Sequence, residues 1–196
     1  MTSRHIAVLI FDGFADWEPS FALTGVRRWG QLSVVSYGYS RDVVTSMGGL
    51  RVVPDCSLSE LVPSEVRLLI LPGGDVWLAD YPQQALLHSC LKRLVSLEIP
   101  VAAICAATTA LARTGVFVDR RHTSNGASYL SEHAPGYQDP SLYRDLLAVR
   151  HRAVITASGL GAVEFAREIF AELGILGEAD LALFQRMYRG AQSVQP

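Results

Sequence analysis

Cysteine is scarce in this sequence. The 196 residues contain three, Cys56, Cys90 and Cys105, and no two of them have CxxC spacing. An odd number of cysteines without such spacing argues against a disulfide framework and against a zinc site. We therefore expect no metal ion, and we predict a reducing compartment, the cytoplasm, as the location.

An excess of charge of one sign is also lacking. The sequence has 17 basic and 19 acidic residues, a formal net charge of -2, which gives nucleic acid or an anionic membrane no electrostatic reason to bind. No apolar run is long enough to span a bilayer, and the residues up to His5 lack the features of a signal peptide. We expect neither nucleic acid nor a membrane as a partner.

Short apolar segments alternate with amphipathic ones along the chain, and 49% of the residues are hydrophobic. Apolar strands without polar alternation are typical of a parallel sheet that is covered on both faces. With no linker or repeat in sight, the pattern predicts one domain over residues 1–196, folded as a doubly wound α/β sandwich. Strands are expected at 6–11, 32–37, 66–71, 101–104, 122–124, 146–149 and 153–157, a strand pair at 42–53, and helices at 19–29, 83–97, 106–114, 129–133, 163–173 and 178–188.

Three of the predicted strand ends carry residues suited to chemistry. Asp16 and Glu18 follow the first strand, the glycine pair Gly73 and Gly74 follows the strand at 66–71, and Cys105 directly follows the strand at 101–104. Sites in open parallel sheets form beyond the carboxyl ends of the strands. We predict that these three ends share one crevice.

Cys105 stands where a strand runs into a helix with no room for a loop. The small residues on both sides of it, Ala102, Ala103, Ala106 and Ala107, suit a nucleophile elbow, in which a strained backbone holds the side chain up. A helix N-terminus there would lower the thiol pKa from about 8.5 toward roughly 4–7. The alternative is a buried cysteine that packs as a small hydrophobe, and position alone does not decide between the two.

The other two strand ends offer partners for this thiol. The amides of Gly73, Gly74 and Ala106 are candidates for an oxyanion hole, each donor worth roughly 2.7–4 kcal/mol in a transition state, although a Gly-Gly pair also suits an ordinary turn. A protonated, buried Glu18 would donate a hydrogen bond to the thiolate. The alternative is a carboxylate that merely favours a helix start. Asp16 competes with Glu18 for the role of partner but is better suited to capping the helix.

These segments together resemble the ThiJ/PfpI superfamily, whose members are class I glutamine amidotransferase-like proteins. The resemblance spans about residues 6–173 and is carried by the segments 12–18, 71–74, 102–112, 156–159 and 164–166. It implies a three-layer flavodoxin-like sandwich with a mostly parallel central sheet, a homodimer, a reactive cysteine at Cys105 and an acidic partner at Glu18. The superfamily includes glyoxalase or deglycase-type proteins, intracellular proteases, chaperones and isonitrile hydratases.

The sequence also departs from this pattern. The protease branch has a histidine directly after the cysteine, where this chain has Ala106, which argues against classical peptidase activity. The deglycase branch has a histidine at the position of Asn125. His122 lies three residues earlier and is expected on the opposite face, so Asn125 is predicted to face the thiol, and Thr108 is a further auxiliary candidate. The pattern from His122 to Asn125 resembles a bacterial subgroup whose members are called proteases or amidases.

The leading hypothesis is a cysteine-dependent hydrolase, hydratase or glyoxalase-like enzyme that acts on a small molecule. No GxGxxG motif and no P-loop occur, so we expect no organic cofactor. The alternative is a non-enzymatic redox or stress sensor in which an oxidant converts Cys105 to a sulfenic or sulfinic acid. A third reading, the ligand-sensing domain of a transcription regulator, leaves too few residues after Leu173 for a helix-turn-helix pair.

Overall fold

A mostly parallel sheet of seven strands runs through the centre of the structure, a computed structural model that describes residues 4–189. Its strands are β1 His5–Leu9, β2 Val34–Gly38, β5 Cys56–Ser57, β6 Val66–Leu71, β7 Val101–Ile104, β8 Ala148–His151 and β9 Val154–Ala157. The strand order is β5-β2-β1-β6-β7-β9-β8, and only the edge pair β8 and β9 is antiparallel. A separate antiparallel pair, β3 Val44–Thr45 and β4 Arg51–Val52, forms the hairpin predicted for residues 42–53.

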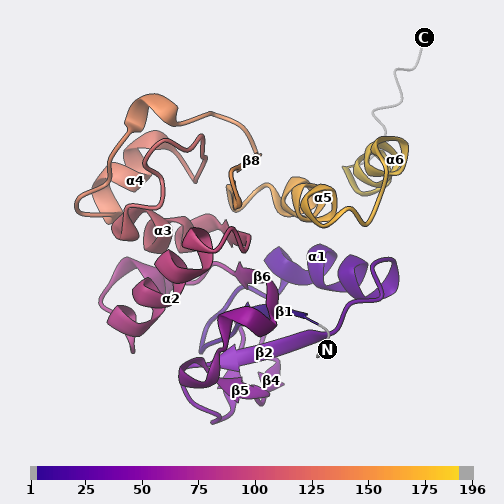
Figure 1. Cartoon of the computed structure of the whole chain (residues 1–196). Helices are drawn as coiled ribbons and strands as arrows, with labels where there is room; N and C mark the ends of the chain where they lie inside the picture. Colours follow the sequence, from indigo (N-terminus) through magenta and orange to yellow (C-terminus); the bar gives the residue numbers. More distant parts are fainter. Residues whose placement is uncertain (1–3, 190–196) are drawn as a thin grey trace.

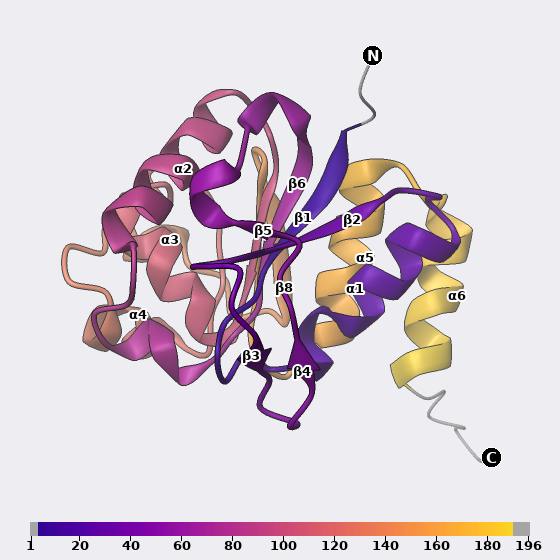
Figure 2. The same ribbon diagram turned by 90° about the horizontal axis from the view of Figure 1, so that it is seen from below.

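Helices cover both faces of the sheet and make three layers (Figures 1 and 2). One layer consists of α1 Trp17–Arg28, α5 Ala162–Leu173 and α6 Glu178–Arg189, and the other of α2 Gln84–Ser96, α3 Thr108–Thr114 and α4 Ala127–His133. Short 3-10 turns are η1 Leu58–Glu60, η2 Pro63–Glu65, η3 Asp75–Leu78, η4 Cys105–Ala107 and η5 Pro140–Leu142. The predicted three-layer sandwich is confirmed. No helix within residues 4–189 combines the length and apolar character needed to cross a bilayer.

The central strands explain the layering. All four residues of β7 are fully buried, as are five of the six residues of β6. Strands buried on both faces have no solvent side to carry polar residues, which is why their sequences read as unbroken apolar runs. The observed β6 and β7 coincide with the strands predicted at 66–71 and 101–104.

Two sheet segments differ from the prediction. The strand expected at 122–124 is only an isolated bridge between His122 and Tyr143. The backbone amide of Thr123 donates instead to the Thr156 hydroxyl at 2.8 Å, so a side chain takes the place of a ladder partner. The edge strand β5 was not predicted, because two residues are too few to show a hydrophobic period.

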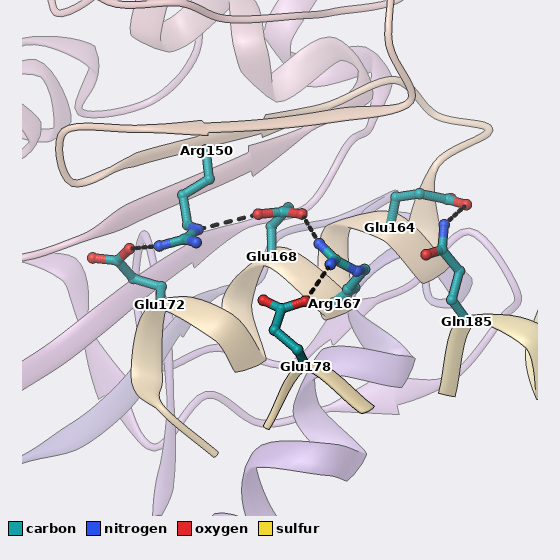
Figure 3. Close-up of polar contacts among 7 residues, drawn as sticks. All are labelled: Arg150, Glu164, Arg167, Glu168, Glu172, Glu178 and Gln185. Atoms are coloured by element: carbon teal, nitrogen blue, oxygen red, sulfur yellow. Dashed lines mark hydrogen bonds and ion pairs between the residues drawn. The ribbon is translucent and has the colours of Figure 1, made fainter. Parts of the chain in front are cut away.

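Charged and polar side chains link β8 to α5, and α5 to α6 (Figure 3). The contacts join Arg150 to Glu168 and Glu172, Arg167 to Glu168 and Glu178, and Gln185 to Glu164. Exposed ion pairs contribute little to stability. The buried side chains Leu181 and Phe184 therefore account for most of the docking energy of α6, while the polar contacts set its register.

Helix α1 crosses α5 at Gly25. A methyl group built on Gly25 would lie 2.1 Å from Cζ of Phe170, a ring that is completely buried. The missing side chain therefore provides the space into which the ring of Phe170 packs.

We predict that Gly25→Ala destabilises the protein by about 1 kcal/mol or more. Helix propensity alone favours alanine by roughly 1 kcal/mol, but forcing a methyl group into a packed core costs about 1–3 kcal/mol, and the Phe170 ring that it would meet is completely buried. Urea unfolding measures the difference. Gly177→Ala is the control, since a methyl group there meets nothing within 4 Å. A stabilised Gly25→Ala variant would show that the two helices are not in close contact.

Candidate active site

The carboxyl ends of β1, β6 and β7 bring three residues together. Glu18 lies in the first turn of α1, Gly73 follows β6, and Cys105 follows β7. The Gly73 amide donates a hydrogen bond of 2.5 Å to Oε2 of Glu18. A methyl group on Gly73 would come within 2.6 Å of the Glu18 carboxyl and 2.9 Å of Cβ of Cys105. Only glycine leaves room for the acid and the cysteine to meet here.

Cys105 has a strained backbone. Its φ is +59°, in the left-handed region that side-chain-bearing residues rarely adopt. The Thr108 hydroxyl donates to the Cys105 carbonyl oxygen at 2.6 Å and is also hydrogen-bonded to the Ser124 hydroxyl at 2.6 Å. Thr108 therefore supports the backbone of the turn, and Cys105 as a residue is only partly buried. This is the geometry that a nucleophile elbow requires.

Asn125 contacts the sulfur. Its Nδ2 donates to Sγ of Cys105 at 3.3 Å, while its Oδ1 accepts from the Gly159 amide at 2.9 Å. The Gly159 contact decides which end of the amide faces the thiol, because a backbone N–H needs an acceptor. His122, as predicted, points elsewhere: it is fully buried, stacks on Phe117 at 4.2 Å between ring centroids, and is hydrogen-bonded to the Tyr137 hydroxyl at 2.6 Å.

Gly159 is a site residue that sequence reasoning did not single out for a role. A methyl group there would lie 3.0 Å from Sγ of Cys105, so the absent side chain makes room for the sulfur. The available signal was its place two residues after the strand at 153–157, at the same edge of the sheet as the other three strand ends.

The predicted set of oxyanion donors needs a correction. The Gly73 amide is committed to Glu18, so it is not free to stabilise a developing anion. Gly74 and Ala106 remain candidates, and the Ala106 amide faces the sulfur, where its hydrogen bond favours the charged thiolate and acts to lower the Cys105 pKa. At Gly74 a methyl group would lie 2.7 Å from the Phe11 ring, which explains the glycine at that position.

Asp16 does not cap α1 through its side chain, contrary to our expectation. It occupies the N-cap position, but its backbone is already helical (φ -61°, ψ -41°) and its side chain makes no capping hydrogen bond. Oδ2 accepts instead from the Gly48 amide at 2.6 Å. Asp16 therefore anchors the β3–β4 hairpin to the start of α1.

Glu18 and Cys105 form a coupled acid pair. Burial raises the pKa of Glu18 to about 7, against the opposing hydrogen bonds of the Gly73 amide and the Cys105 thiol. Burial also raises the pKa of Cys105, and the neighbouring charge of Glu18 raises it further, while hydrogen bonds from Asn125 and Ala106 lower it. The two groups resist carrying charge at the same time, so at most one of them is charged near neutral pH.

The lowered thiol pKa expected from the sequence is therefore wrong for the resting protein. Helix α3 begins only at Thr108, after the 3-10 turn η4, which moves the helix N-terminus away from the sulfur. Burial and the carboxylate outweigh the remaining amide contacts.

The other cysteines have different surroundings. Cys56 and Cys90 are free and partly buried, and burial raises the pKa of Cys90 to about 11. Within residues 4–189, no group of three or more His, Cys, Asp or Glu side chains is arranged to hold a metal ion. Cys105 alone combines a thiol with a contacting carboxyl and a contacting amide.

The fold and this site define a class of doubly wound α/β proteins with a cysteine at a strained strand-to-helix turn beside a buried carboxyl group. The sequence model of the DJ-1/PfpI family matches residues 4–172. The chain therefore belongs to the DJ-1/PfpI family, and the ThiJ/PfpI resemblance is confirmed.

Relatives with known names or structures span nearly the whole chain. A Bacillus subtilis protein named "uncharacterized protease YoaZ" is 31% identical over 194 residues, covering 95% of this chain and 91% of its own. A DJ-1 superfamily protein from Agrobacterium tumefaciens has a solved structure with 37% identity and a TM-score of 0.83, covering 95% of this chain and 100% of its own. The solved structure of a thiJ/pfpI family protein from Bacillus anthracis has 31% identity and a TM-score of 0.84, and the match covers 95% of this chain and 91% of that protein.

Two further relatives carry names that describe an activity. A "glutathione-independent glyoxalase" of Caenorhabditis elegans is 30% identical over 74% of this chain and 75% of its own. A "deglycase" of Pyrococcus abyssi is 30% identical over 61% of this chain and 71% of its own.

We predict that Glu18→Gln shifts the pH profile of Cys105 alkylation to lower pH, by roughly one unit. The substitution removes the nearby negative charge that raises the thiol pKa but keeps an acceptor for the Gly73 amide. Rates with iodoacetamide are read between about pH 6 and 10 by peptide mass spectrometry. Cys90 in the same protein is the internal control. An unchanged profile would mean that Glu18 and Cys105 are not coupled.

Asn125→Ala is expected to shift the same profile in the opposite direction. A hydrogen bond to a charged group is worth about 1.5–3 kcal/mol, so its loss raises the thiol pKa by roughly one to two units. Ser128→Ala, an exposed position on the same segment, serves as the control. If Asn125→Ala leaves the profile in place, the amide does not stabilise the thiolate.

Proposed function

We propose that the protein is a cysteine-dependent enzyme of the hydrolase, hydratase or glyoxalase-like type that acts on a small electrophile such as an aldehyde, an amide or an isonitrile. Cys105 is the nucleophile and Glu18 its proton acceptor and donor. The observation that carries the proposal is the position of the sulfur of one partly buried cysteine, on a strained turn, between a buried carboxyl group and an amide donor. Strain and perturbed acid groups gather at functional sites.

The first chemical step follows from these contacts. The Glu18 carboxylate takes the thiol proton while the sulfur forms a bond to the carbonyl carbon, and the π electron pair moves onto the carbonyl oxygen. The amides of Gly74 and Ala106 are the candidates to stabilise that oxygen, and Glu18 then returns its proton to it. A carboxyl pKa of about 7 suits both the accepting and the donating role.

Neither Asn125 nor His122 replaces Glu18 in this step. Asn125 donates hydrogen bonds but does not accept a proton at neutral pH, and His122 is turned into the core. Ala106 stands where the protease branch has its histidine, which argues against peptide cleavage. The glyoxalase and deglycase names of two relatives support a small carbonyl substrate.

A non-enzymatic redox or stress sensor is the second candidate. The observation in its favour is Asn125 itself, because an amide in place of a histidine leaves the site with fewer means of moving protons. Two molecules of hydrogen peroxide would oxidise the Cys105 thiol to a sulfinic acid, each transferring one oxygen atom to the sulfur and being reduced to water.

The homodimer and the cytoplasmic location implied earlier stay predictions. Exposed tryptophans on and directly after α1, Trp17 at 52% and Trp29 at 40% exposed, are compatible with a surface that a second copy covers.

Turnover assays separate the enzyme from the sensor. We expect the wild-type protein to convert at least one of methylglyoxal, simple amides and isonitriles, with a loss of at least roughly a hundredfold in Cys105→Ala and full activity in Cys90→Ala. If none of these substrates reacts, and mild peroxide adds two oxygens to Cys105 ahead of Cys56 and Cys90 by mass spectrometry, the enzymatic proposal fails in favour of the sensor.

A further inference from the structure

The loop between β9 and α5 controls what Asn125 can do. Within that loop the Gly159 amide holds Oδ1 of Asn125, and the space left by the missing Gly159 side chain receives the Cys105 sulfur. A shift of this loop would therefore alter both the amide donor and the room around the thiol. Contacts that hold this loop in place therefore affect the surroundings of the Cys105 sulfur.

Arg189, at the end of α6, binds this loop. Its Nη2 donates to the backbone carbonyl of Leu160 at 3.1 Å, one residue beyond Gly159. Its Nε donates to Oε1 of Glu164 at 2.6 Å, and its Nη2 also bonds the second carboxylate oxygen. One guanidinium group therefore ties the loop carbonyl to the first turn of α5.

Glu164 is held in place from two sides. Its side chain is only 13% exposed, and Nε2 of Gln185 donates to Oε1 at 3.1 Å (Figure 3). Burial acts to raise its pKa, but hydrogen bonds led by that of Arg189 lower the pKa overall, so the carboxylate stays charged. A bidentate arginine–carboxylate pair of this kind fixes geometry as well as charge.

We propose that Arg189 is a positioning residue for the reactive thiol, acting through the Leu160 carbonyl, Gly159 and Asn125. This inference deepens the proposed function and rests on it, since it concerns the same sulfur. Docking of α6 does not depend on Arg189, because Leu181 and Phe184 bury their side chains against the rest of the molecule. The specific contribution of Arg189 is the contact with the loop.

The contacts distinguish arginine from lysine. The planar guanidinium group has several donors and contacts Glu164 and the Leu160 carbonyl at once. A lysine ammonium group keeps the charge but lacks this planar set of donors. Arg189→Lys therefore retains the ion pair and loses part of the loop contact. Arg186, an exposed residue on the same helix, provides the matched control.

The experiment measures alkylation of Cys105 by iodoacetamide against pH in Arg189→Ala, Arg189→Lys and Arg186→Ala. We expect Arg189→Ala to slow the reaction at neutral pH by about threefold to tenfold and to move the profile to higher pH. Arg189→Lys should fall between Arg189→Ala and wild type, and Arg186→Ala should match wild type. Because no substrate is involved, the result does not depend on whether the protein proves to be an enzyme.

A double-mutant cycle tests the route. If Arg189 acts through Asn125, adding Arg189→Ala to Asn125→Ala produces no further loss. An unchanged profile in Arg189→Ala, or a full additional loss in the Asn125→Ala background, would overturn the proposal. Should Arg189→Ala fail to fold by circular dichroism, Glu164→Gln carries the same cycle, because it weakens the hold on Arg189 while keeping the hydrogen bond to Gln185.

Discussion

The coupling between the Cys105 thiol and the Glu18 carboxyl group is the interaction on which the candidate site depends. Both groups have raised pKa values, chiefly because both are removed from water. Ionisation of either group is unfavourable while the other is charged, so the two groups titrate as a coupled pair. The Gly73 amide favours charge on the carboxylate, whereas Asn125 and the Ala106 amide favour charge on the sulfur. The balance between these donors decides where the negative charge rests.

The sheet topology makes this balance possible. Strand order reverses at the neighbours β1 and β6, from which the chain winds toward opposite edges of the sheet, and ligand sites in such sheets lie at that point. Glu18 and Gly73 lie beyond the carboxyl ends of these two strands, and Cys105 directly follows the next strand, β7. Glycine at position 73 allows them to approach, because any side chain would occupy the space where the carboxyl and the cysteine meet. Burying an acid costs free energy, and the stability of the surrounding packed core offsets that cost.

Much of this arrangement can be predicted from the sequence. The parts that cannot be predicted have one physical reason in common. The strands at 66–71 and 101–104 are predictable because complete burial leaves an unbroken apolar run. The strained turn at Cys105 follows from the local sequence, and the facing of Asn125 toward the thiol follows from the family resemblance. The direction of the thiol pKa does not, since it depends on burial and on a carboxylate 87 positions earlier in the chain. The commitment of the Gly73 amide to Glu18, and the contact of Arg189 with the Leu160 carbonyl, depend likewise on how distant elements dock.

The asparagine beside the sulfur changes how the site responds to pH. A histidine at that position would gain or lose a proton near neutrality and would alter its hydrogen bonds as it did so. Asn125 has no such transition, and the Gly159 amide keeps its Nδ2 directed at the sulfur whatever the pH. In the mechanism that we propose, proton transfer to and from the thiol falls to Glu18, whose pKa of about 7 lies where a histidine would otherwise titrate. The buried acid thus takes over the acid–base range of the missing imidazole, and the amide retains only its orienting role.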